Sequence, residues 1–151
     1  MSTWSTRLKE LGIELPGVAA PLAAYVPATQ SGSWVFTSGQ LPFVDGKLPA
    51  TGKVGAEVSP EEAKQYAATC ILNALAAVHA LVGIDSIKRV VKVVGFVASA
   101  EGFTGQPGVV NGASELLVEI FGDAGKHARS AVGVAELPIG APVEIELIVE
   151  V

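Results

Sequence analysis

Hydrophobic and polar positions alternate with a period of two at the carboxyl end of the chain. In VEIELIVEV, from Val143 to Val151, every odd-numbered residue is apolar and three of the even-numbered ones are glutamates. Such alternation predicts a strand with one buried face. The stretch RSAVGVAE (129–136) predicts another strand just before it. If these two strands pair as a hairpin about the turn LPIGAP, Glu144 lies opposite the neighbourhood of Ala135.

A period of three to four residues indicates two helices. The first begins at Ser59-Pro60-Glu61-Glu62, where the serine can cap the helix and a glutamate can complete a capping box. It ends at Gly83, and the second helix is expected from about Pro107 to Phe121. The apolar run CILNALAAVHALVGI in the first helix is shorter than the ~20 residues that cross a bilayer, which favours a core helix. The residues expected on its inner face are Ala63, Tyr66, Ala67, Cys70, Ala74, Val78 and Leu81.

The remaining segments complete an α+β pattern. Residues 22–28 (LAAYVPA) and 33–39 (SWVFTSG) flank TQSG and predict a hairpin, and residues 87–99 are rich in β-branched side chains and predict a buried strand. A short helix is expected from Thr3 to Leu11, and a long loop from Pro42 to Val58. The predicted order is ββαβαββ, in a single domain (1–151) whose sheet carries two helices on one face.

Composition limits the partners that we expect. Half of the 151 residues are hydrophobic and only 17% are charged, so we infer that part of the apolar surface is buried between subunits. The net charge is −5 and the basic residues are not clustered, which argues against nucleic acid or an anionic membrane as a partner. A single cysteine, Cys70, and an N-terminus without the apolar core of a signal peptide favour a cytoplasmic location.

Arg129 and Glu144 are the two residues most suited to chemistry. Alternation places Arg129 on the same strand face as Ala131, Gly133 and Ala135, which leaves space for a small molecule, and a guanidinium can bind a carboxylate through two parallel hydrogen bonds. The alternative is an ion pair with a nearby glutamate. Glu144 is expected to be partly desolvated, which raises its pKa and suits it to pass a proton. Its alternative is a solvated strand face.

In the hairpin arrangement, Arg129 and Glu144 would be roughly 20 Å apart, so one small ligand could touch both only between two subunits.

Ser38 and Gly39, at the end of a predicted strand, can hydrogen-bond a small polar ligand, although such residues are also a common way to leave a sheet. His127 is expected to be a loop residue rather than a general base. His79, His127 and Cys70 are scattered, so no metal site is expected.

Three stretches resemble the RidA/YjgF family of reactive-intermediate deaminases. They are TSGQLP at 37–42, the asparagine of VVNGASELL at Asn111, and ARSAVGVAELPIGAPVEIELIVEV from Ala128 to the end. The resemblance implies a chorismate-mutase-like domain with a mixed six-stranded sheet, assembled as a homotrimer with sites in the clefts between subunits. It also implies hydrolysis of 2-imino acids, such as 2-iminopropanoate and 2-iminobutanoate, or of their enamine tautomers, to 2-oxo acids and ammonia without a cofactor.

The resemblance assigns a role to each matching residue. It implies that Arg129 binds the substrate carboxylate and that Glu144 positions or activates the attacking water. The further residues that it places at the substrate are Tyr25, Ser38, Gly39, Asn111 and Ala131. Many family members have a cysteine where Ala131 stands, so only a role of the Ala131 backbone can be retained.

The chain also departs from the family in length. Residues 1–19 form an N-terminal extension and there are extra residues around Gly102 to Pro107, as expected of a distinct longer subgroup. Two alternative functions remain at this point. One is a regulatory trimer that binds a small carboxylate without turnover, and the other is an endoribonuclease, which the acidic charge disfavours.

Overall fold

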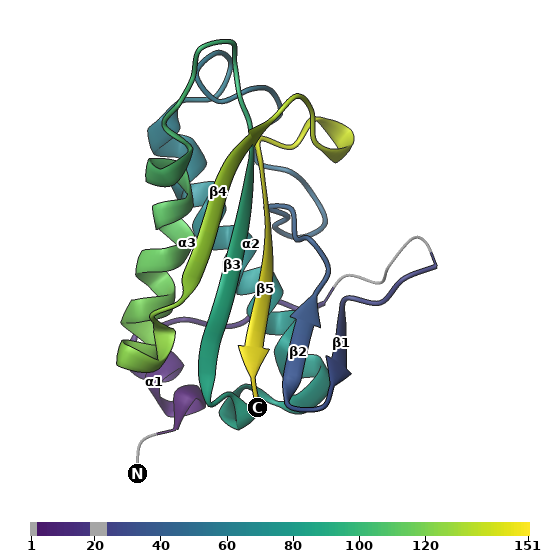
Figure 1. Cartoon of the computed structure of the whole chain (residues 1–151), viewed down its shortest axis with the longest axis vertical. Helices are drawn as coiled ribbons and strands as arrows, with labels where there is room; N and C mark the ends of the chain where they lie inside the picture. Colours follow the sequence, from purple (N-terminus) through teal and green to yellow (C-terminus); the bar gives the residue numbers. More distant parts are fainter. Residues whose placement is uncertain (1–2, 19–23) are drawn as a thin grey trace.

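One mixed sheet with two long helices on one of its faces forms the body of the molecule (Figure 1). The computed structural model describes residues 3–18 and 24–151. The helices are α1 (Trp4–Glu10), α2 (Pro60–Val82) and α3 (Gln106–Phe121), with short 3₁₀ turns at Ile84–Ser86, Gly122–Gly125 and Pro138–Gly140. The strands are β1 (Ala28–Ser31), β2 (Trp34–Thr37), β3 (Arg89–Ala98), β4 (Ala128–Val134) and β5 (Val143–Glu150). The α+β class and the ββαβαββ order are therefore confirmed.

The sheet has five strands in the described residues, in the order β1-β2-β5-β3-β4, so the expected number of six was wrong. The loop before α2 adds no sixth strand, because it contacts the sheet only through isolated bridges such as Gln40 with Ile145 and Val54 with Ser99. β3 and β4 are parallel, and the other neighbouring pairs are antiparallel. Parallel strands need a long crossover connection, which α3 supplies.

The expected hairpin between the last two strands does not form. β5 pairs with β2 on one side and with β3 on the other, whereas β4 lies at the edge beyond β3. The connection from β4 to β5 passes through the turn Pro138–Gly140, where Ile139 has φ of 52° and Gly140 has φ of 77°. This turn carries the chain past the end of β3, as the yellow-green loop of Figure 1 shows.

The first hairpin forms, but its first strand lies later in the sequence than expected. β1 begins at Ala28, so residues 24–27 are not part of a strand, and residues 22 and 23 lie outside the described residues. Ser31 pairs with Trp34 across a two-residue turn in which Gly32 has φ of 58°. Glycine adopts this conformation without steric cost, so a tight turn forms here and residues 29–31 (TQS) belong to β1 and not to the turn.

α2 is the central core helix that its periodicity predicts. Ser59 Oγ accepts a hydrogen bond from the Glu62 backbone N–H, as expected for a cap. The helix is long and apolar enough to cross a membrane, but it lies along the sheet and nine of its residues are buried. Leu81 is an exception to the predicted inner face, because 46% of its surface is exposed.

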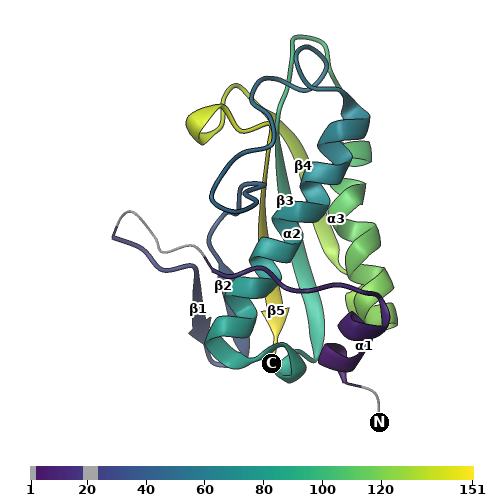
Figure 2. The ribbon, with the colours of Figure 1, turned by 180° about the vertical axis from the view of Figure 1, so that it is seen from behind.

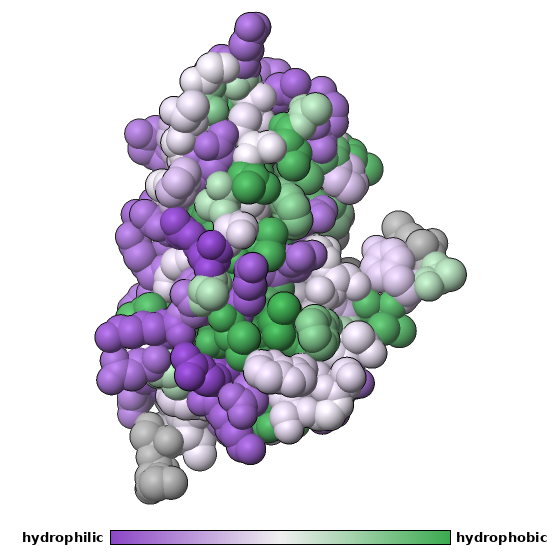
Figure 3. All heavy atoms as spheres, in the orientation of Figure 1, coloured by the Kyte–Doolittle hydropathy of each residue, from purple (hydrophilic) through white to green (hydrophobic). Residues whose placement is uncertain are grey.

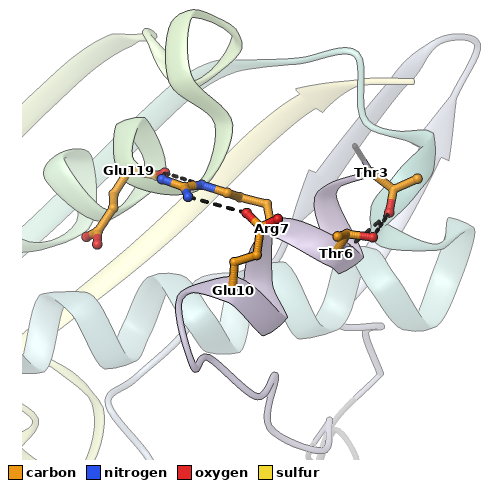
Figure 4. Close-up of polar contacts among 5 residues, drawn as sticks. All are labelled: Thr3, Thr6, Arg7, Glu10 and Glu119. Atoms are coloured by element: carbon orange, nitrogen blue, oxygen red, sulfur yellow. Dashed lines mark hydrogen bonds and ion pairs between the residues drawn. The ribbon is translucent and has the colours of Figure 1, made fainter. Parts of the chain in front are cut away.

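α1 packs against the end of α3, so the described part of the extension (Thr3 to Val18) belongs to the fold. Trp4 donates from its indole nitrogen to the Ile87 carbonyl at 2.7 Å, and its ring meets Phe121 edge-on at 5.0 Å. Figure 4 shows Arg7 reaching from α1 to Glu119 on α3. Its Nε and Nη2 donate to the Glu119 carbonyl oxygen at 3.3 and 3.2 Å. The same guanidinium lies 3.6 Å from Glu10.

The two faces of the sheet differ in what covers them. α2 and α3 cover one face, which is clear from behind (Figure 2). No helix of residues 3–18 or 24–151 covers the opposite face, which is turned toward the viewer in Figures 1 and 3, and hydrophobic side chains gather at its centre. The register of the strands places Trp34, Phe36 and Val132 on this face, where they are about two-fifths exposed (43%, 40% and 43%). We call this surface the open face.

Candidate functional site

Arg129 is held between β4 and α3 by neutral side chains. One of its terminal nitrogens, Nη1, donates to Asn111 Oδ1 at 2.7 Å and to Ser114 Oγ at 3.2 Å, both on α3. In residues 3–18 and 24–151 no carboxylate forms an ion pair with Arg129. The ion pair that the sequence left open as an alternative is therefore not formed by the residues that the structure describes.

The other edge of the Arg129 guanidinium has no partner in the part of the chain that the structure describes. Nη1 has two protons, and Asn111 and Ser114 accept both, whereas Nε and Nη2 donate to no described atom. These two nitrogens form a planar edge that can bind a carboxylate through two parallel bonds. Ala131, two residues further along β4 on the same strand face, is half-buried and presents only a methyl group there.

Glu144 lies against Gly39, near the end of β2. Backbone hydrogen bonds join Gln40 and Ile145 in both directions and bring the two segments together. A Cβ atom on residue 39 would lie only 2.8 Å from Glu144 Cδ, so glycine leaves the space that the carboxylate occupies. Partial burial raises the pKa of Glu144, and the nearby charge of Glu146 raises it further. This environment agrees with the predicted partial desolvation.

Ser38 and Tyr25 belong to the same end of the sheet as Glu144. Ser38 Oγ donates to the Val26 carbonyl at 2.6 Å, and its backbone N–H donates to the Pro27 carbonyl at 2.8 Å. These bonds hold the segment of Tyr25 beside the end of β2, with 56% of the tyrosine exposed. Ser38, Gly39 and Glu144 thus lie at one end of the sheet, and Tyr25 is next to Val26, which Ser38 contacts.

The Arg129 group and the Glu144 group lie on opposite faces of the sheet. Arg129 pairs with Val93, which pairs with Leu147, and both partners are buried beneath the helices. Glu144 pairs with Phe96 and, through it, with Val132 on the open face. The Cα atoms of Arg129 and Glu144 are three residues apart along the strands and two strand spacings apart across the sheet. Together these give a separation of roughly 14 Å. A small ligand cannot contact both side chains of one chain.

Ser114 and His127 extend the Arg129 group and were not predicted to take part. Ser114 Oγ lies 2.9 Å from His127 Nε2, and His127 Nδ1 lies 2.6 Å from the Gly125 carbonyl oxygen. His127 does lie between elements, as expected, but both ring nitrogens have a partner. The spacing contained a signal: Asn111 and Ser114 are three apart on α3 and so share a face of that helix, and His127 precedes Arg129 by two residues, just before β4 begins.

Residues 5–151 match the family described as "YjgF/chorismate mutase-like, putative endoribonuclease". The chain belongs to this family. The family match covers nearly the whole sequence and confirms the resemblance to RidA/YjgF proteins, together with the chorismate-mutase-like fold.

Individual relatives agree with the family assignment. Protein TCP17 of Trypanosoma cruzi is 45% identical over 148 residues, which are 97% of this chain and 92% of that protein. The structure of Atu1372 from Agrobacterium tumefaciens, of unknown function, is 48% identical and superposes with a TM-score of 0.89, covering 98% of this chain and 92% of that one. TdcF of Escherichia coli, solved with bound serine, is 27% identical with a TM-score of 0.63, covering 90% and 92%.

Proposed function

We propose that the protein is a hydrolase that converts 2-imino acids, or their enamine tautomers, to 2-oxo acids and ammonia. The observation that carries this proposal is the Arg129 guanidinium, whose one edge is held by neutral acceptors while the other is open to a carboxylate. The serine bound to TdcF supports a small ligand with a carboxylate. The proposed reaction is the one that the resemblance implies for the family members that have this arginine.

The proposed site lies between two copies of the chain in a homotrimer. Two observations support this arrangement: Arg129 and Glu144 lie on opposite faces of one sheet, and the open face exposes Trp34 and Phe36 to water. Burying an exposed apolar sheet face against other copies is favourable, by about 25 cal/mol per Å². Arg129 of one copy and Glu144 of its neighbour would then share one ligand.

In the proposed mechanism Arg129 binds the substrate carboxylate and Glu144 acts on water. Arg129 fixes the orientation of the substrate and withdraws electron density from the carbon next to the carboxylate. Glu144 accepts a proton as the water oxygen bonds to the carbon of the protonated imine, which gives a neutral carbinolamine. The proton then passes from Glu144 to the carbinolamine nitrogen. As the C–N bond breaks, the hydroxyl oxygen forms the C=O bond and returns its proton to Glu144, so that ammonia and the 2-oxo acid are released. The raised pKa of Glu144 suits it to hold this proton between the two steps.

The test is a coupled assay with a threonine or serine dehydratase in which semicarbazide traps the imine. Wild-type protein should lower the semicarbazone yield. Arg129→Ala should reduce kcat/KM by about 10²- to 10³-fold with the oligomer intact in sedimentation. Arg129→Lys, the matched control for charge, should recover little, because an ammonium lacks the planar pair of donors.

Two outcomes would contradict the proposal. Binding of 2-oxobutanoate without any change in semicarbazone yield would identify a regulatory carboxylate-binding protein. Cleavage of RNA that disappears in Arg129→Ala would identify the endoribonuclease named in the description of the family.

A further inference from the structure

A directed chain of hydrogen bonds ends at Arg129. The Gly125 carbonyl can only accept, so the proton on His127 must be at Nδ1. In the neutral ring Nε2 is then an acceptor, and the Ser114 hydroxyl donates to it. Ser114 Oγ therefore accepts the hydrogen bond from Arg129 through its lone pairs.

This chain gives the guanidinium a second anchor beside Asn111. With two acceptors, at 2.7 and 3.2 Å, both protons of Nη1 are used and the plane of the guanidinium is fixed. With Asn111 alone, the group could rotate about its single remaining hydrogen bond. The orientation of the open edge, formed by Nε and Nη2, thus depends on Ser114, and the orientation of the Ser114 hydroxyl depends on His127.

We propose that Ser114 and His127 are positioning residues that orient Arg129 for carboxylate binding, an inference that rests on the proposed function of Arg129. Neither residue contacts the substrate. Their contribution is to hold the guanidinium in the one orientation that presents two donors to the ligand, which lowers the cost of ordering it on binding.

The first test measures binding of 2-oxobutanoate by calorimetry and KM in the dehydratase-coupled assay. Ser114→Ala and His127→Ala should each raise Kd and KM by roughly tenfold, with a smaller change in kcat. Ser114→Thr, which keeps the hydroxyl, should restore most of the affinity, and added imidazole should restore affinity to His127→Ala. His79→Ala, at the other histidine of the chain, should leave Kd and KM unchanged.

The second test uses the tautomers of the two histidines, which nitrogen-15 NMR distinguishes. His127 should carry its proton on Nδ1. His79 should carry its proton on Nε2, because its Nδ1 accepts the Ile84 backbone N–H at 3.0 Å. In Ser114→Ala the His127 Nε2 signal should shift while the signals of His79 stay in place. This measurement needs no activity, and Ser114→Ala is a small change that serves if His127→Ala does not fold.

The outcomes separate this inference from the proposed function. If Arg129→Ala abolishes 2-oxobutanoate binding while Ser114→Ala and His127→Ala bind like the wild type, the positioning role is overturned. His127 in the Nε2–H tautomer, or protonated on both nitrogens, would also overturn it. If Arg129→Ala itself binds normally, the function proposed for Arg129 fails instead.

Discussion

Gly39→Ala should move the Glu144 carboxylate without unfolding the protein. The new Cβ would lie 2.8 Å from Glu144 Cδ, closer than such atoms can approach, and 3.1 Å from Cγ, which is a tight contact. The crowded atoms are the end of a flexible side chain, so Glu144 can turn away. The backbone at residue 39 does not have a positive φ, so alanine fits it. The backbone N–H that could contact a ligand is also retained.

The expected magnitudes differ sharply for stability and for rate. Rotation of one side chain and a glycine-to-alanine change in an allowed conformation should alter the free energy of unfolding by less than about 1 kcal/mol. A catalytic carboxylate displaced by about 1 Å should lower kcat/KM by about 10²-fold. The variant should therefore melt like the wild type and still be a poor catalyst.

A double-mutant cycle in the imine assay separates displacement of Glu144 from simple blocking of the ligand. When Glu144→Ala has already removed the carboxylate, Gly39→Ala should cost less than about threefold in kcat/KM. Gly108→Ala, where a Cβ would meet no atom within 4 Å, is the control for the substitution itself. A further 10²-fold loss in the Glu144→Ala background would refute the reasoning, because the methyl group would then act on the ligand.

Two more predictions concern charge and helix packing. Burial raises the pKa of Glu144 and the charge of Glu146 raises it further, so on acidification the activity should fall at a pH higher than the pKa of an ordinary glutamate. In a profile of kcat/KM against pH, Glu146→Gln should shift this fall to lower pH. Glu150→Gln, the control, should not shift it. Gly112→Ala places a Cβ 2.8 Å from a backbone carbon of α2 and should lower the free energy of unfolding in urea by about 1–3 kcal/mol, whereas Gly108→Ala should raise it by up to about 1 kcal/mol. Equal midpoints for the two glycine variants would contradict this account of the packing.

Local patterns were sufficient to locate most elements. The capping residues at Ser59 and the apolar period after it predicted α2, and the alternation from Val143 predicted β5, because both signals come from neighbouring residues. The position of β1 was misjudged, because a two-residue turn at Gly32 allowed polar residues to form a strand.

The pairing of the strands could not be obtained in this way. β4 and β5 are adjacent in sequence, which made a hairpin the simplest expectation, but β3 lies between them. Their separation depends on α3, which crosses over to make β4 parallel to β3, and on β5 finding partners on both sides. These are contacts between residues far apart in the chain, and no local pattern encodes them.

For the candidate site, the sequence by itself determined the chemical groups, since an arginine among small residues and a glutamate on a half-buried strand are recognisable from residue type and alternation. Only the tertiary structure decided how they are arranged. It placed Arg129 and Glu144 on opposite faces, and it supplied Ser114 and His127 as the support of the guanidinium. The physical reason is that hydrogen bonds and face assignments depend on the register between strands and on the helix packed over them, which folding of the whole chain sets.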